Sequence, residues 1–256
     1  MNTEIRIIPV NGIGEISSGA DLGLLIFEAL QAQQMTLQQG DVLVVTQKIV
    51  SKAEGQLVKL ETVEPSEFAR IAAQTSRKDA HYIEVALRES RRIVRMDHGV
   101  LLTETHHGFI CANSGIDESN VSGNEGEVML LPQDSDHSAR EIRARLQKLS
   151  HEGTNFEIGV IISDTWGRPW RNGQVNMAIG VSGLESLADY RGQYDPYGYE
   201  LHASVIAVAD ELASAAELVM GKIDRVPVAL IRGYSYIPAS GTVQALLRDP
   251  ATDMFR

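Results

Sequence analysis

The sequence predicts an α+β fold, with mixed, largely antiparallel sheets and flanking helices. Apolar residues make up 43% of the 256 residues, which is enough for a sizeable core. Apolar runs of strand length occur between segments whose apolar residues recur with the period of a helix. Some neighbouring runs are close enough to form hairpins, so strands and helices do not alternate regularly. That order is typical of α+β proteins.

The first elements are a strand, a helix and a second strand. Residues 5–10 form an apolar run of strand length, and a glycine-containing loop follows over residues 11–18. The segment after that loop has apolar residues at helical spacing: Leu22, Leu25, Ile26, Ala29 and Leu30. A second strand is predicted over residues 42–45, and a helix is predicted to begin after Pro65 and Ser66.

The middle of the chain is predicted to form antiparallel strands. Residues 100–103 and 109–111 are largely apolar and flank a turn at His106-His107-Gly108, and a further strand is predicted over residues 128–131. Ser138 and Glu141 have the spacing of a capping box, in which each side chain bonds to a backbone amide near the other. We therefore expect a helix to begin at Ser138.

The last third contains a fully apolar run over residues 158–162, which is typical of a buried strand. Polar residues, Ser163-Asp164-Thr165, follow that run directly. A helix is predicted from apolar residues at helical spacing: Val205, Val208, Ala209, Leu212 and Ala216. A late strand is predicted over residues 226–231.

Composition excludes several classes of protein. Cys111 is the single cysteine, so the chain can form no internal disulfide, as expected of a protein in a reducing compartment. The first residues lack the basic start and apolar stretch of a signal peptide, and no apolar run approaches the roughly 18 residues of a membrane span. We expect a cytoplasmic protein with no membrane partner. The net charge of −11 argues against nucleic-acid binding, which needs a basic face.

Two segments are candidates for binding phosphate. Residues 11–16, with Gly12 and Gly14, lie between a strand and a helix, where backbone amides can approach a phosphate closely. An ordinary turn explains the same residues, because neither the dinucleotide nor the Walker spacing is present. Lys52, after the second strand, could serve phosphate as a point charge or be a solvated lysine before a turn.

Two further segments are candidates for binding metal. Residues 113–120 place Asp117 and Asn120 three apart in a polar, glycine-containing stretch. Carboxylate and amide oxygens suit Mg²⁺ or Mn²⁺, and the same composition suits a turn. Residues 163–171 place Asp164 and Thr165 after the apolar run, followed by Arg168 and Arg171, whose planar groups suit phosphate or carboxylate.

Taken together and in order, these segments resemble the coenzyme F420-0 γ-glutamyl ligases. The resemblance runs from Ile8 to about Gly233. Eight motifs carry it: residues 40–45, 51–55, 113–121, 131–139, 164–168, 178–183, 208–211 and 220–221. We therefore identify residues 1–256 as a single domain of this family, in its stand-alone form without a fused C-terminal flavin-binding domain.

The resemblance implies a reaction and a quaternary structure. Such ligases attach L-glutamate to the lactyl carboxylate of F420-0, can add γ-linked glutamates, consume GTP and use Mn²⁺ or Mg²⁺. Two metal ions per site and a monovalent cation such as K⁺ are compatible with the resemblance. The fold would consist of two intimately packed subdomains in an intertwined homodimer.

The resemblance also implies roles for individual residues. Asp117, Asp164 and Thr165 would bind metal, and Asp117 and Asp164 would be catalytic. We add Arg168 as a catalytic candidate of our own, because Arg168 and Arg171 could grip the phosphodiester of the precursor or the incoming glutamate. Guanine nucleotide would be bound by Ile13, Gly14, Glu15, Ile16, Gln47, Lys48, Lys52, Asn120, Met220 and Gly221. The sequence departs from relatives at Lys222, where some carry an acidic metal ligand, and at Tyr199, where relatives often carry arginine.

The chemistry expected from these residues agrees with the ligase interpretation. Phosphorylating a carboxylate makes it reactive toward an amine, and phosphoryl transfer needs positioning and charge neutralisation more than covalent help. Two alternatives remain open on the residues alone. A metal-dependent phosphohydrolase would need only Asp117 and Asp164, and a non-catalytic guanine-nucleotide-binding module would bind GDP and metal without turnover.

Overall fold

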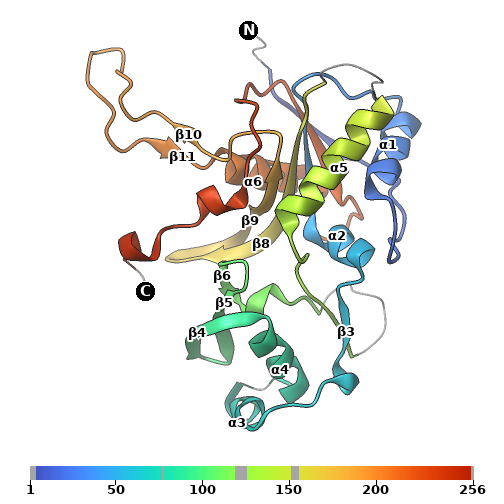
Figure 1. The fold of residues 1–256 in the computed structure, drawn as a ribbon, viewed down its shortest axis with the longest axis vertical. Coiled ribbons are helices and arrows are strands. Elements are labelled where there is room, and N and C mark those ends of the chain that lie inside the picture. Colours follow the sequence, from blue (N-terminus) through green and yellow to red (C-terminus); the bar gives the residue numbers. More distant parts are fainter. Residues whose placement is uncertain (1–3, 77, 119–125, 151–155, 255–256) are drawn as a thin grey trace. The chain divides into compact units, whose positions relative to one another are not determined.

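The structure, a computed structural model, describes residues 4–76, 78–118, 126–150 and 156–254. It is α+β, with mixed and largely antiparallel sheets, as the sequence predicts (Figure 1). The chain divides into two compact units. The first unit comprises Met1–Glu15, Asp21–Gln47 and Ser135–Leu246, and the second comprises Ile16–Ala20, Lys48–Asp134 and Leu247–Arg256.

A five-stranded mixed sheet forms the centre of the first unit. Its strands, in spatial order, are β1 (Arg6–Val10), β12 (Val228–Arg232), β2 (Val42–Thr46), β8 (Gly159–Arg168) and β9 (Arg171–Ser182). Only β2 and β8 pair in parallel, and the other neighbours are antiparallel. The strands predicted over residues 5–10, 42–45, 158–162 and 226–231 are confirmed.

Helices cover both faces of this sheet. Helix α6 (Val208–Met220) packs on the face that carries Val181. The neighbouring Gly180 faces the start of α5 (Ser135–Ser150), because a Cβ atom at Gly180 would lie 2.4 Å from the Ser135 carbonyl oxygen. Successive strand residues point to opposite faces, so α5 and α6 lie on opposite sides of the sheet (Figure 1).

Helix α1 (Leu22–Ala32) packs beside α5. Its first turn is capped by Asp21, whose carboxylate accepts a hydrogen bond from the Leu24 amide at 2.9 Å. The first unit also contains a separate two-stranded antiparallel sheet, formed by β10 (Ala188–Asp189) and β11 (Val205–Ile206). Val205 therefore lies in a strand, and the helix predicted to include it begins at Val208.

The predicted start of α5 is also wrong, because the helix begins at Ser135 and not at the Ser138 capping box. The reason lies in Asp136, in the first turn. Its carboxylate accepts hydrogen bonds from the backbone amides of Val181, at 2.7 Å, and Val243, at 3.1 Å. These distant partners fix the helix start, and a local sequence pattern does not reveal them.

The second unit is built on a three-stranded antiparallel sheet of β4 (Ser90–Asp97), β5 (Val100–Thr105) and β6 (Ile110–Ala112). The predicted hairpin around His106-His107-Gly108 is thus confirmed as β5 and β6. Helices α3 (Glu67–Ser76) and α4 (Ala80–Arg88) pack together and share a core with this sheet.

A second pair of strands, β3 (Leu57–Lys59) and β7 (Glu127–Met129), runs antiparallel in the same unit. Helix α2 (Gln47–Glu54) follows β2 directly and includes Lys52, for which the sequence predicted no helix. Short 3₁₀ turns occur at Leu60–Thr62, Asn113–Gly115, Val243–Leu246 and Pro250–Thr252. Across the residues that the structure describes, no helix combines the length and apolar character that a membrane span requires.

Candidate functional site

An ion pair joins two predicted site residues of the second unit, Lys48 and Asp117. The Lys48 Nζ atom lies 2.8 Å from the Asp117 Oδ2 atom, and both side chains are about three-quarters buried, with exposed fractions of 28% and 23%. Lys48 lies in the first turn of α2, and Lys52 lies one turn later on the same face of that helix. A carboxylate and two ammonium groups are thus held by short, well-anchored segments.

The backbone before Asp117 is strained. Asn113, Ser114 and Gly115 have consecutive positive φ angles of 51°, 57° and 70°. A non-glycine residue in this region costs about 1–3 kcal/mol, and such strain concentrates at functional sites. Buried hydrogen bonds hold it in place: the Ser114 hydroxyl donates to the Ala86 carbonyl at 2.7 Å, and the Ser114 amide donates to the Thr103 hydroxyl at 3.0 Å.

Asp117 itself is fixed through its main chain. Its amide donates to the Met129 carbonyl at 3.0 Å, and the Met129 amide donates back at 2.9 Å. The segment from Asn113 to Asp117 therefore combines a strained turn with a rigidly bonded end. This arrangement presents the Asp117 carboxylate at one fixed place in the second unit. Asn120, predicted to bind nucleotide, lies outside the described residues.

A buried tyrosine supports the same segment. The Tyr82 hydroxyl donates to the Ile116 carbonyl at 3.3 Å. Burial raises the pKa of Tyr82 above its usual value, and the nearby Glu118 and Asp117 carboxylates add to this effect, so the phenol stays protonated. The Lys78 ammonium lies 4.1 Å from the centre of the Tyr82 ring and 3.7 Å from a Glu118 oxygen.

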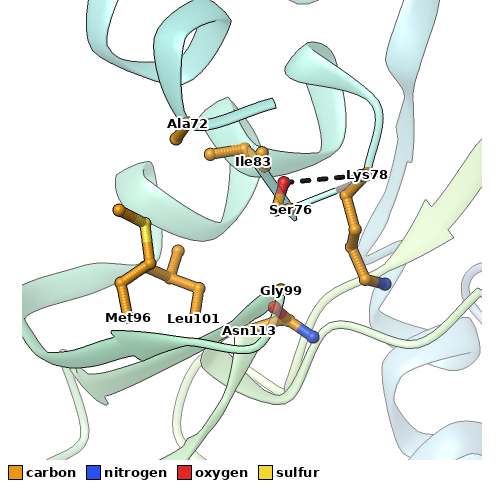
Figure 2. Close-up of a pocket in the computed structure, with 8 residues that line it drawn as sticks. All are labelled: Ala72, Ser76, Lys78, Ile83, Met96, Gly99, Leu101 and Asn113. Atoms are coloured by element: carbon orange, nitrogen blue, oxygen red, sulfur yellow. Dashed lines mark hydrogen bonds between the residues drawn. The ribbon is translucent and has the colours of Figure 1, made fainter. Parts of the chain in front are cut away.

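A small surface pocket lies beside this segment, in the second unit. Figure 2 shows Lys78 and Asn113 at one side of the pocket and Met96 at the other. The remaining lining residues are Ala72, Ser76, Ile83, Gly99 and Leu101. Among the described residues, none of those predicted to bind metal or nucleotide lines it, so this pocket is not the predicted site.

The predicted phosphate loop is anchored by apolar side chains. Ile13 and Ile16 are buried, with exposed fractions of 9% and 7%, whereas Glu15 is exposed. Gly12 needs to be glycine because its φ is +85°. Gly14 has no positive φ, and a Cβ atom there would meet no protein atom within 4 Å. The protein's own packing therefore does not explain Gly14, and a closely approaching ligand would.

The hairpin of β8 and β9 carries the other predicted metal residues, in the first unit. Thr165 faces Asn176 across the hairpin, and its hydroxyl donates to the Asn176 amide oxygen at 2.7 Å. Asp164 and Thr165 are adjacent in a strand, so their side chains point to opposite faces. We expected both residues to follow the strand. They lie within it instead, because β8 continues to Arg168.

A polar stripe on α6 bonds to the same hairpin. Its residues are four and three positions apart: Asp210, Ser214 and Glu217. Asp210 accepts from the Ala178 amide at 2.9 Å, and Ser214 donates to the Asn176 carbonyl at 2.7 Å. Burial raises the pKa of the Asp210 carboxyl above its usual value. Such a stripe in a largely apolar helix is a sequence signal that pattern analysis could have used.

The stripe ends in a cluster of four residues: Thr165, Asn176, Glu217 and Lys222. The Asn176 amide nitrogen donates to Glu217 Oε2 at 2.8 Å, and Lys222 Nζ lies 3.3 Å from Glu217 Oε1. Lys222 also donates to the Thr165 hydroxyl oxygen at 2.5 Å. Asn176, Glu217 and the contacts of Lys222 were not predicted from the sequence.

The end of α6 gives structural roles to two residues predicted to bind nucleotide. Met220 is 3% exposed and packs in the first unit's core, so only its backbone is available to a ligand. Gly221 ends the helix with φ 60° and ψ −174°, a conformation that essentially only glycine adopts. Its amide donates to the Glu217 carbonyl at 3.1 Å, so helix capping alone explains this glycine.

At the tip of the hairpin, Arg168 faces Arg171. Arg168 donates to the Asn172 carbonyl at 3.3 Å, and Trp170 between them is 81% exposed with φ 59°. The tip therefore carries an exposed Arg171, an exposed indole on a residue with positive φ, and a partly buried Arg168. Such a combination can bind a planar or anionic group.

The predicted metal ligands fit a divalent cation only in part. Asp117, in the second unit, and Asp164, in the first, offer the hard oxygens that Mn²⁺ and Mg²⁺ prefer. Within the described ranges, no cluster of three or more His, Cys, Asp or Glu residues is placed to hold a metal. Thr165 does not fit, because its neutral hydroxyl is already bonded to Asn176 and to the Lys222 ammonium. Charges of +1 and +2 about 4 Å apart repel by about 8 kcal/mol at an effective dielectric constant of about 20. Asp117 also contacts an ammonium, that of Lys48, but the negative charge of its carboxylate offsets the repulsion between the two cations.

Comparison with known proteins decides the family. The F420-0:γ-glutamyl ligase family model matches residues 12–233, which includes most of both units. The chain belongs to this family. It is 45% identical over 255 residues to the coenzyme F420:L-glutamate ligase of Methanothermobacter thermautotrophicus, covering 98% of this chain and 99% of that protein.

Two further relatives in this family carry the same name. The coenzyme F420:L-glutamate ligase of Methanopyrus kandleri is 44% identical over 257 residues, covering 98% of each chain. That of Archaeoglobus fulgidus is 38% identical over 253 residues, covering 98% of this chain and 96% of the relative. The similarity therefore extends over both compact units, including the segments around Asp117 and Asp164.

Proposed function

We propose that this chain joins L-glutamate to coenzyme F420-0, coupled to the cleavage of GTP to GDP and phosphate. The observation that carries the proposal is the match, over 98% of the chain, to proteins named coenzyme F420:L-glutamate ligase. Two features of the structure support it. The Lys48–Asp117 pair places charged groups that could contact phosphate or metal, and the open space beside Gly14 would let a phosphate approach the backbone.

The reaction proceeds in two steps that balance. A carboxylate oxygen of F420-0 attacks the γ-phosphorus of GTP, the bond to the bridging oxygen breaks, and GDP leaves. The resulting acyl phosphate is attacked at its carbonyl carbon by the amine of L-glutamate. Phosphate leaves, the nitrogen loses a proton, and an amide remains. A second cycle on the γ-carboxylate of the attached glutamate gives a γ-linked glutamate.

The chain's own residues bind and position the phosphates in this proposal. Lys48 and Lys52 project from one face of α2 and supply positive charge for the phosphates, which a protein with a net charge of −11 needs at this place. Backbone amides near Gly14 approach the phosphates, and Gln47 and Gly221 border the nucleotide. Arg168 and Arg171 grip the phosphodiester of F420-0 or the carboxylates of glutamate.

Asp117 and Asp164 are the proposed carboxylate ligands for Mn²⁺ or Mg²⁺. When bound, the metal neutralises charge on phosphate oxygens. In this proposal Lys48 pairs with Asp117 and orients its carboxylate. The main-chain bonds between Asp117 and Met129 then hold that carboxylate still.

Domain organisation, quaternary structure and cellular location are also part of the proposed function. Residues 1–256 form a single ligase domain in this proposal, and the active form is a homodimer. A cytoplasmic location is supported by the single cysteine, Cys111, which is buried and forms no disulfide. In this proposal the reaction also requires a monovalent cation such as K⁺.

The proposal is tested by mass spectrometry of reactions that contain the purified protein, F420-0, L-glutamate and Mn²⁺, with GTP in one tube and ATP in another. Glutamyl adducts that form only with GTP would support the substrates and the nucleotide together. Release of GDP without an adduct would instead indicate a phosphohydrolase. Nucleotide binding without release or adduct would indicate a binding module.

A further inference from the structure

The cluster of Thr165, Asn176, Glu217 and Lys222 has the arrangement of a cation site in which the cation is a side chain. The Lys222 ammonium lies 2.5 Å from Thr165 Oγ1 and 3.3 Å from Glu217 Oε1. Two oxygen acceptors, contributed by β8 and α6, thus converge on one positive charge. Nothing in the sequence pattern around Lys222 predicts this convergence.

Hydrogen-bond accounting explains why the two oxygens are available to a cation. The Thr165 hydroxyl has one proton, which it donates to Asn176 Oδ1 at 2.7 Å, so its lone pairs face the ammonium. The amide nitrogen of Asn176 donates to Glu217 Oε2 at 2.8 Å, which leaves Oε1 for Lys222. Asn176 is 3% exposed, so this orientation of its amide is fixed by both bonds.

The position of Lys222 follows from the end of α6. Gly221 closes the helix in a conformation that essentially only glycine adopts, and Lys222 is the next residue. Glu217 is on the last turn of the same helix, so the lysine and its carboxylate partner are set by one rigid element. The Lys222 side chain is 60% exposed, so little packing holds it. The two contacts of its ammonium group, with Thr165 and Glu217, therefore fix its position.

We propose that the Lys222 ammonium is a tethered cation that takes the place of a dissociable metal ion at Thr165 and Glu217. This inference deepens the proposed function, on which it rests for the metal requirement, because it sets how many divalent ions the protein takes up. An ammonium on the chain is present at every metal concentration. The protein therefore has one divalent-ion site fewer than the same oxygens could provide.

The test is a count of bound Mn²⁺ per chain, by equilibrium dialysis and by electron paramagnetic resonance, on the wild type and on Lys222→Gln and Lys222→Glu. We expect each variant to bind one more Mn²⁺ per chain than the wild type. We expect Lys222→Glu to bind the additional ion at least tenfold more tightly than Lys222→Gln, because it adds a carboxylate ligand.

Two control variants make the count specific. Lys222→Arg keeps a cation at the end of α6, so its count should equal that of the wild type. Lys148→Gln removes an exposed lysine elsewhere in the first unit and should also leave the count unchanged. Equal melting temperatures of all the proteins would show that folding is not the cause of any difference. An unchanged count in both Lys222→Gln and Lys222→Glu would overturn the proposal, as would an added ion in Lys222→Arg.

The number of Mn²⁺ ions gained by the Lys222 variants tests the tethered cation independently of the ligase reaction. If no glutamyl adduct forms but the Lys222 variants gain an ion, the ligase proposal fails and the tethered cation stands. If adducts form and the variants gain no ion, the ligase proposal stands and the tethered cation is wrong.

Discussion

Lys48 and Asp117 form an ion pair with an Nζ–Oδ2 distance of 2.8 Å, although one residue lies in the first turn of a helix and the other follows a strained turn. The pair is mostly buried, and its acidic member is fixed by two main-chain hydrogen bonds to Met129. A lysine and an aspartate are thereby held at defined positions in the second unit. Both residues were assigned to the site from the sequence resemblance, and their contact is new information from the structure.

Removing either member of this pair should reduce turnover much more than stability. We expect Asp117→Asn and Lys48→Gln each to lower kcat by about 100-fold or more, as the loss of a major electrostatic contact does. The free energy of unfolding should fall by about 1–3 kcal/mol, because each change leaves a mostly buried charge without its partner; this is small against the usual 5–15 kcal/mol of a folded domain. Urea unfolding and steady-state kinetics of both variants and of the double variant measure this. Additive effects of the two changes on kcat would contradict a functional coupling of the pair.

Asp164→Asn separates a metal-binding role from a structural one. The substitution keeps the size of the side chain and removes its charge, so folding should stay near normal while turnover and Mn²⁺ affinity fall by at least tenfold. Calorimetric titration with Mn²⁺ and thermal unfolding are the measurements. Asp189→Asn, on the exposed β10, is the matched control and should change neither. Unfolding of Asp164→Asn with no specific loss of metal binding would assign Asp164 a structural role.

Gly14→Ala should affect GTP binding and spare stability, whereas Gly12→Ala should lower stability. Gly14 has open space around it and no positive φ, so alanine should leave the protein as stable or up to about 1 kcal/mol more stable. Its methyl group should nevertheless weaken GTP binding several-fold. Gly12, with φ +85°, should lose about 1 kcal/mol of stability on the same change. Unchanged GTP affinity in Gly14→Ala, measured by calorimetry, would remove the loop from the nucleotide site.

The arginines at the hairpin tip should act on substrate binding. Replacing both Arg168 and Arg171 by alanine should raise the Michaelis constant for F420-0 or for L-glutamate by about tenfold or more, because charge-assisted contacts are lost. Steady-state kinetics with each substrate varied separately show which one the arginines bind. Arg6→Ala, at an exposed position of β1, serves as the control. Unchanged constants for both substrates would show that the tip binds neither.

Glu84 should govern part of the acid stability. Hydrogen bonds from Ser66, with a further contribution from Arg88, lower the pKa of Glu84 to about 2. An acid with a lowered pKa in the folded state stabilises the protein above its unfolded pKa, and this stabilisation is lost as the pH falls toward 2. Glu84→Gln should therefore be less stable than the wild type by about 1–3 kcal/mol at pH 7.

The pH dependence of that difference provides the check. Urea unfolding of both proteins between pH 7 and pH 2.5 should show the gap narrowing below about pH 4.5, the ordinary value for this carboxyl. A gap that stays constant over this range would mean that the Glu84 pKa is not lowered in the folded protein.

Much of the fold could be predicted from the sequence because its central strands are buried on both faces. The runs at residues 42–45 and 158–162 are apolar throughout, and both lie in the middle of the first unit's sheet. Helix α2 was missed for the opposite reason. Two residues of its buried face, Gln47 and Ser51, are polar, with exposed fractions of 1% and 0%, so no apolar period marks the helix.

Strand β4 was missed because it lies at the edge of its sheet and is rich in charge. Edge strands commonly carry charged side chains, which hide them from hydrophobic patterns. In the candidate site, Asp164 and Thr165 could be singled out from their place after an apolar run. Their separation onto opposite faces and the bonds from Thr165 to Asn176 and Lys222 depend on strand register and on α6, which no local pattern specifies.

In the proposed reaction, GTP activates a carboxylate of F420-0 before glutamate attacks it. Transfer of oxygen-18 from that carboxylate to phosphate tests this step most directly. F420-0 labelled with oxygen-18 in its lactyl carboxylate is incubated with the protein, L-glutamate, GTP and Mn²⁺, and the released phosphate is analysed by mass spectrometry. We expect one labelled oxygen in the phosphate for each amide formed, because that oxygen leaves with the phosphoryl group. Phosphate without label, in a reaction that still forms the amide, would contradict the claim.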